Sequence, residues 1–501
     1  MRVAETVATG RRVLLGIVAS LLVGTTIGCA ANAPTGIDAE VPSRPELLPK
    51  KEVSFELRAP ERWVLANGLV VYYIFDDELP VMKGKLMFPG GSLFEPAEHA
   101  SLFEALGEQL REGSVRGIRP EQLDKLLDDT AASIESGYGA ENGSVSFSCL
   151  EEDFDRIFAL ASRVVREPAF DERRLAIWKG LALQAIKRRR DDPETMAGIA
   201  FVQTVYGKDS PFGRLPREES LKRISTAMMR EAHRKFVRPN GSFLVLSGAV
   251  PKERVVAAIE REFGSWARTA DPLPSLPAVD KTVRPGIYVL ERDFDQASVV
   301  LGHLGPPRLP PDIHQMSIYN RILGTGGFGS LLFNEIRSKL GLAYDVSGGL
   351  APGIVLGTFE ITLGTKASEV GKAVARVVEI IEQTRTELPP TENFDSAKSS
   401  VERSFIFRFD SSFAVAQRAA QLEMTQFPPD YDATYLAKIG AVTPVAVRSV
   451  GTQWIRPEDY VVVIVGKVDI QALKSQLAPL GLPFYRLEFA VEPEVKGPLF
   501  P

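Results

Sequence analysis

Apolar and polar positions along the chain follow two different periods. Short apolar runs, such as 69–74 and 286–290, predict buried β-strands. Longer stretches, with apolar residues three and four positions apart, predict helices. The clearest of these helices are 121–132, 171–190, 367–388 and 393–407. Because strands are mixed with long helices, the sequence predicts an α+β protein whose mainly antiparallel sheets are covered on one face by helices.

The pattern of the first half returns in the second half. An arginine–proline pair, a buried strand and a closing glycine occupy 238–250, and the same order returns at 456–468, an offset of 218 residues. A turn containing glycine at 87–92 falls opposite 302–306 at about the same offset. Two motifs at one offset indicate two homologous domains. We place the domains and their proline-rich linker at 59–267, 287–490 and 268–286, respectively.

The beginning of the chain is typical of a targeting signal. Arg11 and Arg12 precede the apolar run 13–23, which is too short to span a bilayer. A basic start, a short apolar core and small residues afterwards are typical of a secretory signal. Residues 1–28 are therefore predicted to be removed from the mature protein.

The sequence around Cys29 predicts a lipid anchor. Residues 26–29, Thr-Ile-Gly-Cys, resemble a bacterial lipobox, in which a lipid is attached to the cysteine. Residues 29–58 would then form a tether, and the chain would be lipid-anchored in a bacterial cell envelope, at the outer membrane facing the periplasm. A plain signal peptide, cut near residues 30 and 31, is the alternative.

Composition narrows the chemistry that the chain can carry. With 45% hydrophobic and 25% charged residues among 501, the chain has the composition of a globular protein. The net charge of −5 argues against nucleic-acid binding, which usually depends on an excess of basic residues. Two cysteines cannot form a disulfide framework, and Cys149, in an apolar alternation, is predicted to be a buried, inert thiol. Four histidines leave little material for histidine chemistry.

Several motifs together resemble the pitrilysin/insulinase-type zinc peptidases. Residues 63–71, Trp-Val-Leu-Ala-Asn-Gly-Leu-Val-Val, resemble the opening L-x-N-G-L-x-V of that family. Residues 322–344 resemble its C-terminal signature, L-G-x-x-x-x-S-x-L-F-x-x-x-R-x-x-x-G-L-A-Y. The resemblance covers nearly the whole chain after the tether. It implies duplicated α+β domains, two of which form half of a clamshell.

The resemblance also locates the positions where active members bind zinc. Those members carry H-x-x-E-H on a helix, so that two imidazoles and a later glutamate hold Zn²⁺ and the inner glutamate deprotonates the bound water. Counting back nine residues from Gly113 puts Glu104 at the first histidine, Gly107 at the general base and Glu108 at the second histidine. The third-ligand position is Ala185.

None of these four positions holds the residue that zinc chemistry needs. Glu104 and Glu108 could hold a hard cation weakly, but two carboxylates alone make a poor zinc site. We predict instead that they are solvated helix glutamates, and that this chain binds no metal or cofactor itself. The histidines at positions 99, 233, 303 and 314 do not form a zinc triad by their spacing, and His233 is predicted to lie on a helix surface.

Arg337 and Tyr344 match the family where the zinc positions do not. The resemblance implies that this pair lies across a chamber from the zinc and holds the substrate backbone. A guanidinium offers a rigid fork of donors, and a tyrosine hydroxyl can donate to a carbonyl oxygen that gains charge. The alternative is an arginine in a surface ion pair and a tyrosine packed in a sheet.

The whole pattern resembles the non-catalytic chain of the bacterial two-chain members of the family. It implies a homologous catalytic subunit that carries the zinc, and an extended peptide as substrate. Two alternatives stay open: a structural or peptide-binding lipoprotein without proteolytic activity, and an active peptidase with an unusual metal site.

Overall fold

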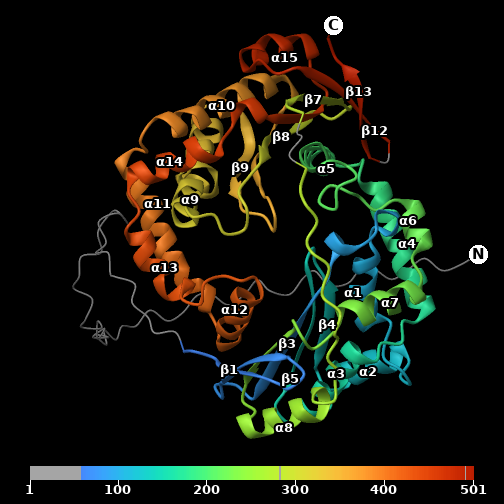
Figure 1. The fold of residues 1–501 in the computed structure, drawn as a ribbon. Coiled ribbons are helices and arrows are strands. Elements are labelled where there is room, and N and C mark those ends of the chain that lie inside the picture. Colours follow the sequence, from blue (N-terminus) through green and yellow to red (C-terminus); the bar gives the residue numbers. More distant parts are fainter. Residues whose placement is uncertain (1–57, 281–283, 491, 501) are drawn as a thin grey trace, which may run out of the picture. The chain divides into compact units, whose positions relative to one another are not determined.

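The computed structural model describes residues 58–280, 284–490 and 492–500, which belong to one compact unit. The predicted signal peptide, Cys29 and the tether up to residue 57 lie outside the described residues. Two mixed β-sheets, one from each half of the chain, organise the described part (Figure 1). None of its helices is long and apolar enough to cross a bilayer.

The first sheet has six strands in the order β1-β2-β6-β3-β5-β4. They are β1 (Glu61–Val64), β2 (Val70–Phe75), β3 (Val81–Pro89), β4 (Ser133–Tyr138), β5 (Asn142–Leu150) and β6 (Phe243–Gly248). Strands β2 and β6 run parallel, and the other neighbours are antiparallel. All of β6 is buried, as expected for a central strand. The predicted strand 69–74 is β2, shifted by one residue.

The second sheet has seven strands in the order β13-β12-β7-β11-β8-β10-β9. They are β7 (Gly286–Glu291), β8 (Gln296–Leu304), β9 (Ala343–Ala351), β10 (Thr358–Lys366), β11 (Val461–Gly466), β12 (Phe484–Phe489) and β13 (Pro493–Pro498). Strands β6 and β11 begin 218 residues apart, and each pairs with one parallel and one antiparallel neighbour. The last strand, β13, lies beyond residue 490, where the sequence placed the end of the second domain.

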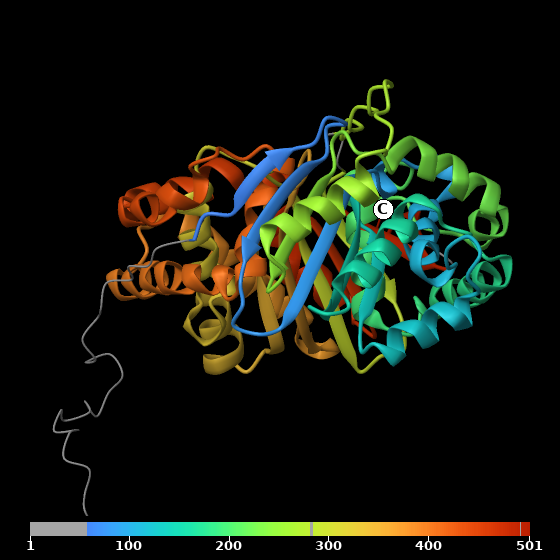
Figure 2. The ribbon, with the colours of Figure 1, turned by 90° about the horizontal axis from the view of Figure 1, so that it is seen from below.

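Each half contributes a layer of helices that packs on its own sheet and builds one core. In the first half these are α1 (Leu102–Glu112), α2 (Pro120–Asp129), α3 (Phe154–Arg166), α4 (Glu172–Arg188), α6 (Glu218–Arg223), α7 (Thr226–Phe236) and α8 (Lys252–Phe263). In the second half they are α9 (Ile313–Asn320), α10 (Val370–Thr386), α11 (Thr391–Ser404), α13 (Tyr431–Gly440), α14 (Pro444–Trp454) and α15 (Ile470–Leu477). Figure 2 shows the cyan and green helices of the first half and the orange and red helices of the second half on opposite sides of the strands. The four helices predicted from periodicity correspond to α2, α4, α10 and α11.

The prediction that each sheet is covered on only one face is wrong, because the two halves exchange a helix. Helix α5 (Pro193–Tyr206), from the first half, packs Phe201 and neighbouring residues on the second sheet, against Val463 and Tyr288. Helix α12 (Ser412–Met424), from the second half, packs Ala416 and Ala420 on the first sheet. Neither helix is among the four that the sequence periodicity predicted, and a local pattern cannot reveal which sheet a helix covers.

Ion pairs and hydrogen bonds fix the exchanged helices at their ends. Arg62 on β1 pairs with Glu423 on α12 at 2.7 Å, and the Tyr72 hydroxyl donates to the same carboxylate. The Tyr206 hydroxyl on α5 donates to the carbonyl of Leu356 at 3.0 Å. These contacts join segments that are far apart in the sequence.

Cys149 lies on β5 and is buried, as predicted. Burial raises the pKa of its thiol to about 12, so the thiolate is scarce at neutral pH.

Candidate functional site

Helix α1 carries three of the four zinc-motif positions. Glu104 and Glu108 are exposed and lie one turn apart, whereas Gly107 is buried. The Ser101 hydroxyl donates to Glu104 at 2.8 Å. Partial burial raises the pKa of Glu108, and the nearby carboxylates of Glu112 and Glu135 raise it further. The two glutamates are therefore solvent-facing residues of one helix.

Strand β4 fills the space where the side chain of a general base would lie. A Cβ added at Gly107 would lie 2.5 Å from the backbone nitrogen of Tyr138 and 2.8 Å from Cα of Gly137. These contacts are with backbone, which cannot move aside as a flexible side chain can. Position 107 therefore has no room for any side chain.

A serine hydroxyl is inserted into α1 at the same point. Ser136 on β4 donates from Oγ to the carbonyl of Gly107 at 2.6 Å and accepts from the backbone N–H of Arg111 at 3.1 Å. In a regular helix that N–H would bond directly to that carbonyl. The hydroxyl thus bridges the helical hydrogen bond and holds β4 against α1.

The third-ligand position lies on the exposed face of α4. Ala185 is exposed, and Ile177 and Leu181 on the same helix are exposed as well. Within 58–280, 284–490 and 492–500, no group of three or more His, Cys, Asp or Glu side chains has the geometry to hold a metal ion.

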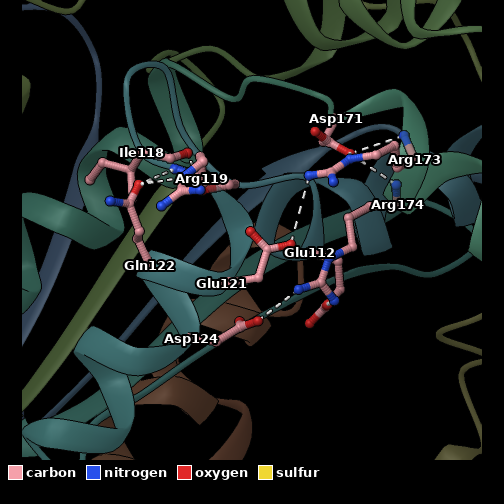
Figure 3. Close-up of polar contacts among 10 residues, drawn as sticks. Glu112, Ile118, Arg119, Glu121, Gln122, Asp124, Asp171, Arg173 and Arg174 are labelled. Carbon is pink, nitrogen blue, oxygen red and sulfur yellow. Dashed lines mark hydrogen bonds and ion pairs between the residues drawn. The ribbon is translucent and has the colours of Figure 1, made fainter.

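Ion pairs, shown in Figure 3, join the two helices that carry the zinc-motif positions. Asp124 on α2 accepts from Arg111 on α1 at 2.8 Å and from Arg174 on α4 at 2.7 Å. Arg174 also donates to Glu112 on α1 at 3.0 Å. We call these four residues the helix-clamp network. No local pattern in the sequence predicts this network, because Asp124 and Arg174 lie 50 residues apart.

Two of the four histidines are hydrogen-bonded into the fold away from the zinc-motif positions. His303, fully buried on β8, accepts at Nε2 from the backbone N–H of Arg456 at 3.0 Å and donates from Nδ1 to the carbonyl of Leu304 at 2.7 Å. Burial lowers its pKa to about 4. His233 is half-buried and hydrogen-bonded to the carbonyl of Val165 at 2.6 Å, so the prediction that it lies on the surface is wrong.

The Arg337 and Tyr344 side chains are both exposed, on consecutive elements of the second half. Arg337 lies on the π-helix η6 (Phe333–Lys339), and Tyr344, 48% exposed, is near the start of the edge strand β9. The Leu342 backbone N–H donates to the carbonyl of Ile336 at 2.9 Å, which fixes the turn between η6 and β9.

The surface ion pair of the alternative interpretation is not observed for Arg337 in the described residues, whereas Tyr344 lies in the sheet with about half of its side chain covered. Arg337 has no ion pair within the described part of the chain; its guanidinium lies 4.8 Å from the centre of the Phe333 ring. The nearby cations Lys339 and Arg376 both pair with Glu335. The donor fork of Arg337 and about half of the Tyr344 side chain therefore face solvent.

Comparisons with known proteins match the part of the chain that carries Arg337 and Tyr344. The family model described as the peptidase M16 inactive domain matches residues 223–401, which include Arg337 and Tyr344. An uncharacterised zinc protease of Streptomyces coelicolor is 24% identical over 336 residues, which cover 64% of this chain and 73% of that protein.

Two solved structures share the fold. The crystal structure of a peptidase M16 inactive domain from Pseudomonas fluorescens superposes with a TM-score of 0.75 at 22% identity, covering 82% of this chain and 98% of that chain. The periplasmic protease PqqL of Escherichia coli superposes with a TM-score of 0.71 at 17% identity, covering 83% of this chain and 46% of that chain.

The family signature is thus present where the family model matches, and the zinc positions lack their ligands. The chain is therefore similar to the peptidase M16 family, that of the pitrilysin/insulinase-type peptidases: the inactive-domain model of that family matches residues 223–401, and the fold is shared with a solved M16 inactive domain.

Proposed function

We propose that this chain is the substrate-binding, non-catalytic subunit of a two-chain zinc peptidase that acts on peptides or unfolded proteins. One observation carries the proposal: the backbone of β4 occupies the place of the general base at Gly107, while the Arg337 and Tyr344 side chains are exposed. A chain of this kind binds substrate but depends on another chain for the water that attacks the peptide bond.

The exposed pair suits the binding of a peptide backbone. The Arg337 guanidinium, with no carboxylate of the described residues paired to it, can donate two parallel hydrogen bonds to peptide carbonyls. The Tyr344 hydroxyl can donate to a carbonyl oxygen as that oxygen gains negative charge.

The zinc in this proposal belongs to a homologous catalytic subunit. The missing ligands at positions 104, 108 and 185 and the missing general base at position 107 support this division, as does the match to an inactive-domain model. The match to less than half of the E. coli periplasmic protease supports an assembly of two such units.

The assembly would be held in the cell envelope through lipidated Cys29, at the outer membrane facing the periplasm. The lipobox-like residues 26–29 support this location. Cys29→Ala should move the protein from the membrane fraction to the soluble fraction. Retention of the variant in washed membranes would contradict the lipid anchor.

The central test is reconstitution with a zinc-binding homologue. We expect the mixture to cleave an unfolded protein substrate, and the isolated chain not to. Arg337→Ala and Tyr344→Phe should each lower kcat/KM by about 100-fold, a size typical of a lost transition-state hydrogen bond. Arg230→Ala is the matched control, since that guanidinium also lies over a ring, 5.8 Å from the centre of Phe170.

Two results would contradict the proposal. One is full activity of the Arg337→Ala, Tyr344→Phe double variant in the reconstituted mixture. The other is hydrolysis by the isolated chain with stoichiometric bound zinc.

A further inference from the structure

The most exposed large apolar side chain in the described part of the molecule lies beside the Arg337 and Tyr344 pair. Phe328, on the short turn η5 (Gly327–Gly329), is 81% exposed. Leu340 and Tyr344, on the same signature segment, are about half exposed. Such clustered exposure contributes little to folding, and it is typical of surfaces that bind another molecule.

The Phe328 ring is held in place rather than free. It meets the Phe333 ring edge to face, with centroids 4.6 Å apart, and the Arg337 guanidinium contacts the same Phe333 ring, 4.8 Å from its centre. The buried Ser330 donates from Oγ to the carbonyl of Gly327 at 2.8 Å, which fixes the turn. Gly327 has φ +56°, a left-handed conformation that favours glycine.

The charged side chains near Phe328, Phe333 and Arg337 indicate what kind of ligand would bind there. Glu335 is shared between Lys339, at 2.5 Å, and Arg376, at 3.3 Å, so the nearest acidic side chain on η6 is already paired. Arg337 therefore presents hydrogen-bond donors toward solvent next to an aromatic face. The complementary ligand carries carbonyl oxygens adjacent to an apolar group, as an extended peptide does.

We propose that Phe328 is a specificity-determining residue that receives an aromatic or large aliphatic side chain of the peptide whose backbone Arg337 holds. This inference rests on the proposed function, because it assigns a side-chain preference to the same binding surface. Ring-on-ring contact favours such a side chain over a small one. Phe333 is a positioning residue, since it sets the places of both Phe328 and Arg337.

The test uses the mature full-length chain and calorimetric titration with two decapeptides of glycine, serine and glutamine, blocked at both ends. They differ only at the central residue, which is Phe in one and Ala in the other. We expect about tenfold tighter binding of the Phe peptide. Phe328→Ala should bind both peptides equally, Phe328→Leu should keep part of the preference, and Arg337→Ala should weaken both peptides by the same factor.

Phe407→Ala is the matched control, because Phe407 is 77% exposed on a different segment of the second half; it should leave both affinities unchanged. If the wild-type chain binds both peptides equally, or Phe328→Ala keeps the preference, this inference is wrong and the proposed function stands. If the wild-type chain binds neither peptide, the proposed function fails and this inference with it. Loss of association with the catalytic homologue in Phe328→Ala, with peptide preference intact, would make the turn a subunit contact and overturn the inference.

Discussion

Where α1 meets β4, the backbone closes over the position of a missing general base, whereas from η5 to β9 the polar and aromatic side chains face solvent. In the first region the backbone of β4 leaves no room for a side chain at position 107, an inserted serine hydroxyl holds β4 against α1, and the helix-clamp network joins α1 to α4. In the second region Phe328, Arg337 and Tyr344 make few contacts that folding requires. The contrast teaches that packing alone accounts for the closed position, whereas a contact outside the chain is needed to explain the exposed groups.

The largest expected effect is on stability, when a glycine is replaced by alanine at a position filled by backbone or at one that faces solvent. Gly107→Ala should lower the free energy of unfolding by about 3 kcal/mol, because its Cβ would meet backbone atoms of β4. Gly180→Ala, on the exposed face of α4 with no atom within 4 Å of the new Cβ, should raise it by about 1 kcal/mol. Urea denaturation measures both.

The same closure should defeat an attempt to rebuild the zinc site. The quadruple variant with Glu104→His, Gly107→Glu, Glu108→His and Ala185→Glu should not bind zinc stoichiometrically by metal analysis. Equal stability of Gly107→Ala and wild type, or a zinc-loaded quadruple variant, would show that β4 can withdraw from α1.

One buried titratable group in each half should make the free energy of unfolding depend on pH, with opposite signs. Burial lowers the pKa of His303 to about 4, so its contribution to stability is present above pH 6.5 and is lost as the pH falls toward 4. Burial raises the pKa of Glu95 to about 7, against two backbone N–H bonds that lower it. Its contribution is full below about pH 4.5 and is lost as the pH rises through 7.

Each residue should change the free energy of unfolding by about 2 kcal/mol over 1.5 pH units. Between pH 5 and 6.5 the two slopes oppose each other in the wild-type chain, so each variant should reveal the other group. In denaturation over this range, His303→Gln should leave a stability that falls as the pH rises, and Glu95→Gln should leave a stability that falls as the pH falls. If Glu95→Gln keeps the wild-type slope between pH 5 and 7, the carboxyl is ionised throughout and the expectation for the first half is wrong.

Breaking the helix-clamp network should have a smaller effect. Asp124→Ala leaves Arg111 and Arg174 without their shared carboxylate and should cost about 1–2 kcal/mol, since the pair is partly exposed. Asp129→Ala, which removes an exposed ion pair with Lys125 on α2, should change stability by less than about 0.5 kcal/mol. Equal effects in thermal denaturation would mean that the network does not hold α1 to α4.

The sequence predicted what depends on neighbouring residues and missed what depends on distant ones. Periodicity located α4 and β2 to within two residues, and the repeat of 218 residues marked β6 and β11 as equivalent strands. The motif spacing placed Glu104, Gly107 and Glu108 correctly on one helix. Ser136, by contrast, has no local signature, because its role depends on the register of β4 against α1. His233 was misplaced for the same reason, since its partner Val165 lies 68 residues away.

The exchange of α5 and α12 means that neither half of the molecule is a finished domain. Cut free at the proline-rich linker, the first half would expose Tyr72 and Val245, and the second half would expose Val463 and Tyr288, each as a bare apolar sheet face. Each half therefore needs the other to complete its core during folding. A single-copy ancestor with this architecture would have been a homodimer in which the subunits exchange a helix. Fusion of two gene copies would then have joined the two subunits in one chain.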